Sequence, residues 1–184
     1  MEKVKLGPEP LLYPMPAVLV GAKVDEKPNF MTAAWCGIAA SKPPAISVGL
    51  HKVRHTLKGI NEQGTFSINV PSSDLAQKVD YCGIYSGRKR DKSHLFQVFY
   101  GVLETAPLIG DCPVNIECKV IHSLDLGSHI LVVGEISETY INEDCLTDKK
   151  PDPLKIDPLI YTTGVTQYQR LGEVIGKAFH MGKD

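Results

Sequence analysis

Apolar and polar residues alternate in short runs along the first part of the chain, a pattern typical of β-strands separated by turns. Three apolar, β-leaning runs come first, at residues 17–24, 30–40 and 45–50. The segments between them are turn sequences, D-E-K-P-N and S-K-P-P. Residues 65–70 then alternate strictly, which predicts a strand with Ser67 and Asn69 on its polar face. This part of the chain therefore predicts a meander of short strands.

Three segments have helical spacing instead. Residues 56–63 have one apolar stripe, with Thr56 placed to cap the N-terminus and Gly64 placed to end the helix. A second helix is expected from Ser72 or Ser73 to about residue 83. Residues 171–179 repeat apolar side chains at helical spacing near the C-terminus. Two glycines weaken this last helix by about 1 kcal/mol each, so packing would have to hold it.

Strand signals return in the second half, at residues 114–120, 129–136 and 159–163. Many short strands with a few helices at the connections predict a mainly β fold, a barrel or sandwich with added helices. No glycine-rich fingerprint opens a helix after a strand, so neither a classical dinucleotide fold nor a P-loop is expected. The length of 184 residues predicts one domain, covering residues 1–184.

Composition restricts the classes of binding partner and the cellular compartment that we expect for this chain. The 20 basic and 21 acidic residues nearly cancel, so no global field attracts nucleic acid or an anionic membrane. The early apolar run at residues 17–22 is too short to span a bilayer, and no cleavage site follows it. The five cysteines are scattered without a C-x-x-C pair, so no zinc site is expected. These features predict a cytoplasmic protein with buried free thiols.

Two basic segments are candidates for binding an anion. Arg54, His55 and Thr56 come immediately before a predicted helix, whose free amides favour a negative charge. An ordinary helix cap with a solvated arginine explains these residues equally well. Residues 86–92 contain four bases and a glycine, which suits a phosphate, although such charge runs are usually solvated loops.

Two further candidates involve aromatic side chains. Residues 29–36 read N-F-M-T-A-A-W-C, where two small alanines leave room for a flat ligand against the backbone. Trp35 is the only tryptophan, and such side chains more often belong to the core. His129 opens an apolar strand, where a lone histidine is more often structural than a ligand contact. Nucleophilic catalysis has little support, because the chain has no G-x-S-x-G and no cysteine with an adjacent histidine.

Six segments taken in order resemble a known family: N-x-M-T-A-A-W, S-K-P-P, R-H-T, G-x-F-S-I-N-V-P, S-G-x-x-x-D-K and G-S-H-x-x-x-V-G-E. Together they resemble the flavin reductase-like, FMN-binding split-barrel family, and especially its flavoredoxin branch. The resemblance spans roughly residues 10–180. It implies a Greek-key split β-barrel that forms a homodimer, with one FMN per subunit near the interface.

The resemblance also implies roles for single residues. It places the flavin ring along Asn29, Thr32, Ala33, Ala34 and Trp35, with Ser41 nearby. It assigns the FMN phosphate to Arg54 and Thr56. Further contacts to the phosphate or the ring edge would come from Ser86, Gly87, Asp91 and Lys92. His129 would lie close to the ring or to an incoming nicotinamide, and it is the one catalytic candidate; no metal ligand is implied.

The implied function is that of an FMN-dependent oxidoreductase, a flavin reductase or flavoredoxin, with NAD(P)H or a redox protein as electron donor. The flavin carries the chemistry, and the protein supplies position and electrostatics. Lys92 or a protonated His129 would stabilise the negative charge that reduction builds at one ring edge. Three alternatives stay open: an electron carrier without turnover of its own, a non-enzymatic FMN-binding or storage protein, and a dimeric structural domain that does not bind flavin.

Overall fold

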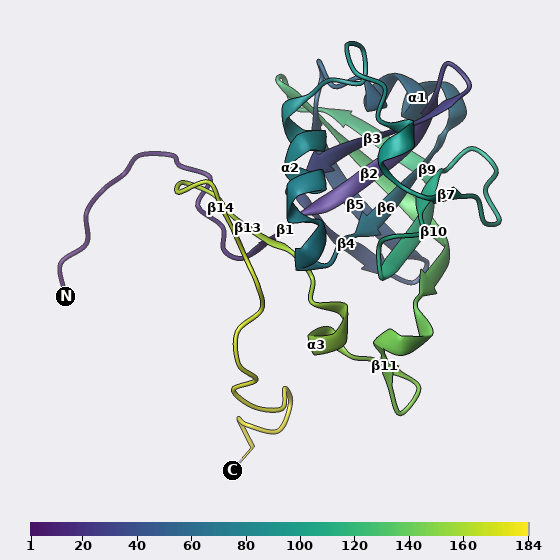
Figure 1. Cartoon of the computed structure of the whole chain (residues 1–184). Helices are drawn as coiled ribbons and strands as arrows, with labels where there is room; N and C mark the ends of the chain where they lie inside the picture. The colour runs from purple at the N-terminus through teal and green to yellow at the C-terminus, as the bar shows by residue number, and fades with distance from the viewer. Residues whose placement is uncertain (184) are drawn as a thin grey trace.

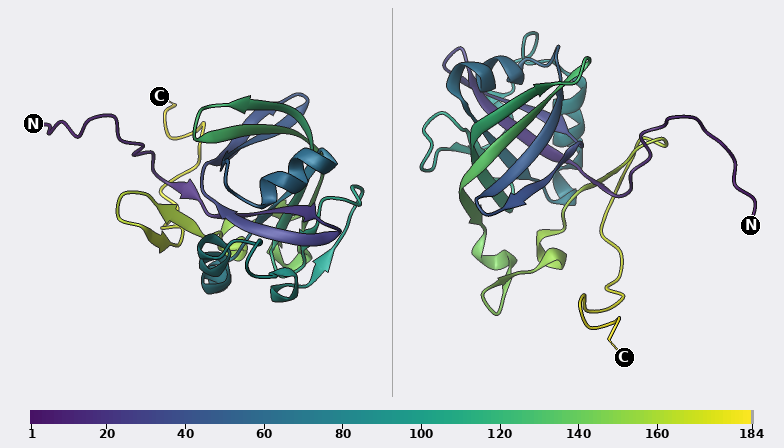
Figure 2. Two further views of the ribbon diagram at one scale, coloured as in Figure 1. Left: turned by 90° about the horizontal axis from the view of Figure 1, so that it is seen from above. Right: turned by 180° about the vertical axis from the view of Figure 1, so that it is seen from behind.

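The computed structural model describes residues 1–183 and has a seven-stranded antiparallel sheet at its centre, with strand order β3-β2-β6-β9-β10-β5-β4. Its strands are β2 (Val18–Val24), β3 (Lys27–Ala33), β4 (Cys36–Ser41), β5 (Pro44–His51), β6 (Thr65–Val70), β9 (Val114–Asp125) and β10 (His129–Ile141). The sheet curls into a barrel, and helix α1 (Thr56–Gln63) lies across one end (Figure 2). The first and last strands of this order are β3 and β4, so the split in the barrel lies between two strands that follow each other in sequence.

Smaller elements surround the barrel (Figure 1). Helix α2 (Ala76–Ile84) follows a 3-10 turn at Ser73–Leu75 and packs beside β3. The remaining elements are β1 (Met15–Pro16), a 3-10 turn at Ser93–Leu95, β7 (Val98–Phe99), β8 (Leu108–Ile109), a 3-10 turn at Glu143–Cys145, β11 (Leu146–Thr147), β12 (Lys150–Pro151), α3 (Pro153–Ile156), β13 (Ile160–Thr162) and β14 (Gln167–Gln169). Within residues 1–183, no helix is both long and apolar enough to cross a membrane.

Two hydrophobic clusters share strand β2. Alternate side chains of a strand point to opposite faces. Val18 and Val20 therefore pack inside the barrel with Phe66, whereas Leu19 packs outside with Phe30 and other residues of the second cluster. Burial on both faces explains why residues 17–24 are almost continuously apolar rather than alternating.

Most predicted elements of the barrel are confirmed. The strands expected at 17–24, 45–50 and 65–70 correspond to β2, β5 and β6, and α1 has the predicted bounds. Gly64 ends α1 in the left-handed conformation, with φ of 67°. The expected run at 30–40 is two strands, because the chain crosses the split of the barrel at residues 34–35.

Two details of the prediction are wrong. Thr56 does not cap α1: His55 occupies the cap position without a side-chain cap hydrogen bond, and Thr56 is the first helical residue. The polar face expected for β6 is buried, because Asn69 and Ser67 belong to an internal hydrogen-bond network. The Asn69 carboxamide accepts from the Ile109 amide at 2.9 Å and donates to the Leu19 carbonyl at 3.0 Å.

The helix predicted over residues 171–179 does not form in the structure. Residues 170–177 have no regular secondary structure, and the N-terminal residues 1–14 are also irregular. Both arms project from the barrel (Figures 1 and 2). An isolated segment of this length is marginal as a helix even without glycine. The apolar stripe is exposed, with Ile175 at 89% and Phe179 at 93%, so it lacks the packing that the helix would need.

Candidate functional site

A cationic pocket of about 500 Å³ opens between the start of β3, the residue before α1 and the loop at residues 87–92. Lys27, Arg88, Lys89 and Arg90 line it. Its two carboxylates already have partners: Asp25 forms an ion pair with Lys58, and Asp91 accepts from Ser93 and lies 3.5 Å from the Lys27 ammonium. Hydrogen bonds from Ser93 hold the pKa of Asp91 at about 2. The pocket therefore favours an anion.

Three predicted site residues meet at the floor of this pocket. The Asn29 side chain, only 7% exposed, donates to the Thr56 hydroxyl at 2.7 Å. Gly87 packs so closely that an added Cβ would lie 2.0 Å from the Asn29 side-chain oxygen. Only a glycine lets the loop pass at this distance. The structure thus brings together β3, α1 and the basic loop at residues 87–92, whose residues the sequence analysis assigns to one cofactor.

His55 contributes a buried nitrogen to the same pocket. Its Nδ1 has no hydrogen-bond partner within the described residues, and an added Cβ on Gly87 would lie 3.0 Å from its ring. Burial, followed by the charge of Arg88, lowers the pKa of His55. A buried polar atom without a partner is costly unless a ligand or water bonds to it. The sequence pattern places His55 among the anion-binding candidates, whereas the family resemblance assigns the phosphate only to its two neighbours, Arg54 and Thr56.

Arg54 and Lys92 both hold the C-terminal end of α2. The Arg54 guanidinium donates to the Gly83 carbonyl at 3.1 Å. The Lys92 ammonium, in a residue only 2% exposed, donates to the carbonyls of Tyr85 at 3.0 Å and Cys82 at 3.3 Å. Burial lowers the pKa of Lys92. These cations therefore fix one wall of the cleft and retain further N–H donors for a ligand.

Two smaller hollows lie at the end of β3 and share Thr32, Ala34 and Arg54. One, of about 350 Å³, has Thr32, Ala34 and Arg54 on one side and residues of α2 and β13–β14 on the other. The second, of about 130 Å³, is lined by residues 31–35 with Gly49, His51, Arg54 and His129. The Thr32 hydroxyl donates to the Val79 carbonyl of α2, which fixes this wall. Residues 32–35 thus form a continuous surface beside Arg54.

Trp35, His129 and His51 form an aromatic group at the edge of the smaller hollow. The ring centroids of Trp35 and His129 are 4.6 Å apart, and those of His51 and His129 are 4.9 Å apart. The His129 Nδ1 lies 2.8 Å from the Ser128 hydroxyl. Burial and the neighbouring His51 and Arg54 lower the pKa of His129, which disfavours the protonated form expected from the sequence. Trp35 is 48% exposed, so it is a surface residue rather than a core residue.

The chain is similar to proteins of known family over nearly its whole length. A family model described as flavin reductase like domain matches residues 11–171. The chain belongs to the flavin reductase-like family. Two solved flavoredoxins match it: that of Methanosarcina acetivorans is 43% identical with a TM-score of 0.97, covering 100% of this chain and 98% of that one. That of Desulfovibrio vulgaris (Miyazaki F) is 41% identical with a TM-score of 0.92, covering 99% and 100%.

A third solved structure is an FMN-binding protein from Thermus thermophilus with bound 1-cyclohex-2-enone. It is 25% identical with a TM-score of 0.82, covering 96% of this chain and 99% of that one. These matches confirm the resemblance found in the sequence and the mainly β, split-barrel fold. They also support a flavin-related redox function for this chain.

Ser41 is separated from the other predicted flavin contacts. It is exposed at the turn of the β4–β5 hairpin, where it pairs with Pro44. Pro44 begins β5 and His51 ends it, seven residues later, so the two ends of this strand are about 23 Å apart at 3.3 Å per residue. Ser86 and Asp91 lie in the basic loop, where the Ser86 hydroxyl accepts from the Arg88 amide at 3.3 Å. These two side chains shape the loop.

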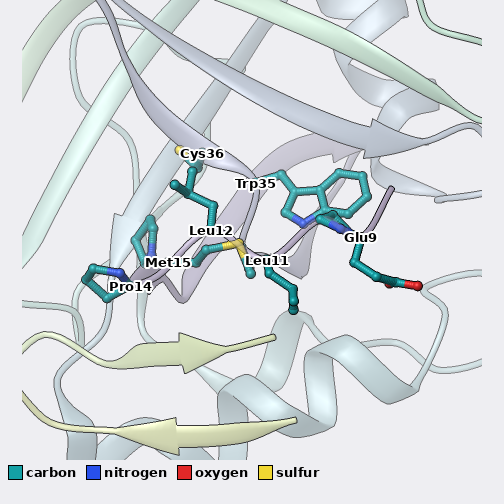
Figure 3. Close-up of a pocket in the computed structure, with 10 residues that line it drawn as sticks. Glu9, Leu11, Leu12, Pro14, Met15, Trp35 and Cys36 are labelled. Atoms are coloured by element: carbon teal, nitrogen blue, oxygen red, sulfur yellow. The ribbon is translucent and has the colours of Figure 1, made fainter. Parts of the chain in front are cut away.

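A larger apolar pocket adjoins Trp35 and was not predicted from the sequence. It has a volume of about 640 Å³ and lies between residues 9–16 of the N-terminal arm and residues 34–36 (Figure 3). Leu12, Met15 and Cys36 face it together with Trp35. The run P-E-P-L-L-Y-P-M-P was the available signal, since its prolines favour an extended chain where the arm joins the barrel. No group of three potential metal ligands occurs within residues 1–183.

Proposed function

We propose that the chain is an FMN-dependent oxidoreductase that holds FMN non-covalently and accepts hydride or electrons from NAD(P)H or from a protein donor. The observation that carries this proposal is the shape and charge of the cleft. The cationic pocket, with an Nδ1 of His55 that has no partner among the described residues, lies at the start of β3, and residues 31–35 line a hollow at its end. The relative from Thermus thermophilus, named as an FMN-binding protein, supports the choice of FMN.

The residues of the cleft fit the two ends of FMN. A phosphate dianion needs cations and N–H donors, and Arg88, Lys89 and His55 line the cationic pocket. The isoalloxazine ring is flat, and Ala34, which lines both hollows, adds only a methyl group to the proposed wall, whereas the Ala33 side chain packs in the barrel core. Asn29 and Thr56 are bonded to each other at the floor of the cationic pocket and would meet the phosphate end of the cofactor. Arg54 borders both hollows and does not line the cationic pocket, so it would contact the cofactor on the ring side.

When bound, the flavin would take up hydride at N5 and develop negative charge at N1 and O2. Lys92 has one N–H donor left after its two carbonyl bonds, and we propose that this donor faces the charged edge. Nδ1 of His129 is bonded to Ser128, which leaves Nε2 as the ring nitrogen available to the cofactor or to a nicotinamide. Burial, with the neighbouring His51 and Arg54, lowers the pKa of His129 and so favours the neutral form of this ring.

A second candidate function is electron transfer without turnover on NAD(P)H. The exposure of Trp35 and its position beside the hollow favour it, because a ring along residues 32–35 would have one edge within reach of a redox protein. The two flavoredoxins described above, 43% and 41% identical to this chain, also favour this function. A non-enzymatic FMN-binding or storage protein is the third candidate. A homodimer, a single domain over residues 1–184 and a cytoplasmic location complete the proposal; the five free cysteines support a reducing compartment.

An anaerobic visible spectrum of the purified protein separates these functions. Prompt bleaching of a flavin spectrum by NADH or NADPH supports a reductase. A spectrum that bleaches only with dithionite supports a carrier, or a storage protein if no protein donor reduces it either. Failure to bind added FMN overturns the proposal. Lys92→Met is expected to lower FMN affinity or midpoint potential, whereas Lys150→Met on the exposed β12 is expected to change neither.

A further inference from the structure

The hollow lined by residues 31–35 contains a histidine that neither the sequence pattern nor the family resemblance singles out. His51 ends β5, and its direct partner across the sheet is His129, the first residue of β10. Residues directly opposite each other on antiparallel strands have side chains on the same face of the sheet. Both histidines line the hollow of about 130 Å³ beside Arg54. His51 is therefore placed to act on the one catalytic candidate of the chain.

The His129 ring has two aromatic neighbours. The ring centroid of Trp35 lies 4.6 Å away with 37° between the planes, and that of His51 lies 4.9 Å away with 74° between the planes. Trp35 also packs against β5, since an added Cβ on Gly49 would lie 3.5 Å from its side chain. The last torsion of a histidine side chain is broad, so a ring without such contacts samples many orientations. The two contacts together restrict the plane of the His129 ring.

Among the groups that contact the His129 ring, His51 is the one held by the central sheet. β5 lies between β10 and β4 in the strand order. The Val53 amide donates to Nδ1 of His51 at 3.3 Å, so the proton of the neutral ring lies on Nε2. The other two groups are less constrained: Trp35 lies between β3 and β4, and Ser128, 2.8 Å from Nδ1 of His129, is exposed in the β9–β10 turn.

We propose that His51 is a positioning residue, which holds the His129 imidazole against Trp35 in one orientation. A histidine held in this way offers the same ring nitrogen to every ligand that enters the hollow. The consequence for the cofactor rests on the proposed function: Nε2 of His129 would already be oriented when flavin or a nicotinamide binds. Less side-chain freedom is then lost on binding, which strengthens the complex.

The charges around His129 act in the same direction. They come from His51 on β5, from Arg54 before α1, and from Lys52 and Asp125 beside the β9–β10 turn, which form an ion pair at 2.7 Å. Two imidazoles at this separation resist protonation of both rings. Burial, followed by the charges of His51 and Arg54, lowers the pKa of His129. His51 thus favours the neutral form of the ring that it positions.

A fluorescence titration of flavin-free protein tests the coupling of the two histidines. Trp35 is the only tryptophan, and a protonated imidazole quenches an adjacent indole, so the emission follows the protonation of His129. The parent midpoint should lie below the ordinary histidine value of 6.5. His51→Phe and His51→Asn both remove a charge and should raise it, whereas His122→Asn, at an exposed histidine of β9, is the control and should not. An unchanged midpoint in both His51 variants would overturn the proposal.

The same two variants separate the ring contact from the charge. Phenylalanine keeps an aromatic ring beside His129, whereas asparagine keeps only an acceptor for the Val53 amide. Nitrogen-15 NMR of flavin-free protein should show one tautomer of His129 in the parent and in His51→Phe, and a mixture in His51→Asn. One tautomer in all three proteins would mean that His51 does not orient the ring, and the proposal would fail.

FMN titration then connects the histidine pair to the cofactor. His51→Asn should weaken FMN binding about tenfold, and His51→Phe should stay within about threefold of the parent. Unchanged affinity in His51→Asn, together with the expected fluorescence and NMR results, would count against the contact of His129 with the cofactor and would leave the positioning supported. His51 is exposed, so thermal unfolding of both variants should match that of the parent.

Discussion

Gly87→Ala tests whether the contact between the basic loop and Asn29 builds the anion pocket. The added Cβ would lie 2.0 Å from the Asn29 oxygen and 3.0 Å from the His55 ring. Real Cβ contacts essentially never fall below 3.0 Å, so the two groups must separate by about 1 Å. Asn29 is buried and bonded to Thr56, so we expect the exposed loop to move.

The cost of this overpacking is about 1–3 kcal/mol when the loop is held in place. In the free protein the loop relaxes outward, so the unfolding free energy should change little. In the complex the loop must close, which weakens FMN binding by about 5- to 150-fold at 1.4 kcal/mol per factor of ten. FMN titration followed by flavin fluorescence measures this directly. Gly172→Ala is the matched control, since its Cβ would meet nothing within 4 Å. Parent-like FMN affinity in Gly87→Ala would refute the assignment of this pocket.

Three further predictions follow from buried or isolated groups. The buried Glu117 carboxylate accepts from two backbone amides and the Tyr140 hydroxyl, so Glu117→Gln should lower the unfolding free energy by about 2 kcal/mol in urea titrations; a loss below about 0.5 kcal/mol would contradict this. The pKa of His55 is lowered on folding, so the unfolded chain binds more protons and stability should fall as the pH drops below 6.5. His55→Gln should flatten that slope in flavin-free protein, and an unchanged slope would exclude His55 as its source. Ser41→Ala should leave FMN affinity unchanged; a tenfold loss would indicate that Ser41 reaches the site of the partner subunit.

The barrel could be predicted from the sequence because its signals are local. Turn residues mark the strand ends, and Gly64 ends α1 through a backbone conformation that glycine adopts readily. The prediction of a C-terminal helix was wrong because its formation does not depend on local signals alone. Its spacing is helical, but a helix of this length depends on packing, and the partner surface is not encoded near it in the sequence. The buried polar face of β6 was missed because Asn69 finds its partners about 40 and 50 residues away.

The candidate site was predicted by resemblance at the level of segments, and less well at the level of atoms. The sequence could indicate that residues 29–35, 54–56 and 86–92 act together, and the structure places most of them in two pockets, at the start and at the end of β3. It could not indicate that Nδ1 of His55 is buried without a partner within the described residues, since that depends on how closely the loop passes. The apolar pocket was also hidden, because it is formed by an irregular arm lying across the start of β4.

Arg54 and Lys92 explain why motif residues are difficult to assign to a single role. Both were expected at the cofactor, and both bond to carbonyls at the C-terminal end of α2. Those carbonyls have partial negative charge, which favours cations at this position with or without a ligand. Each side chain nevertheless retains donors, because a guanidinium has five N–H groups and an ammonium has three. Arg54 and Lys92 could therefore donate to a bound anion while they still donate to the carbonyls at the end of α2. A substitution at either position alters the wall of the cleft together with its charge, so a loss of FMN affinity identifies a ligand contact only where the unfolding free energy is preserved.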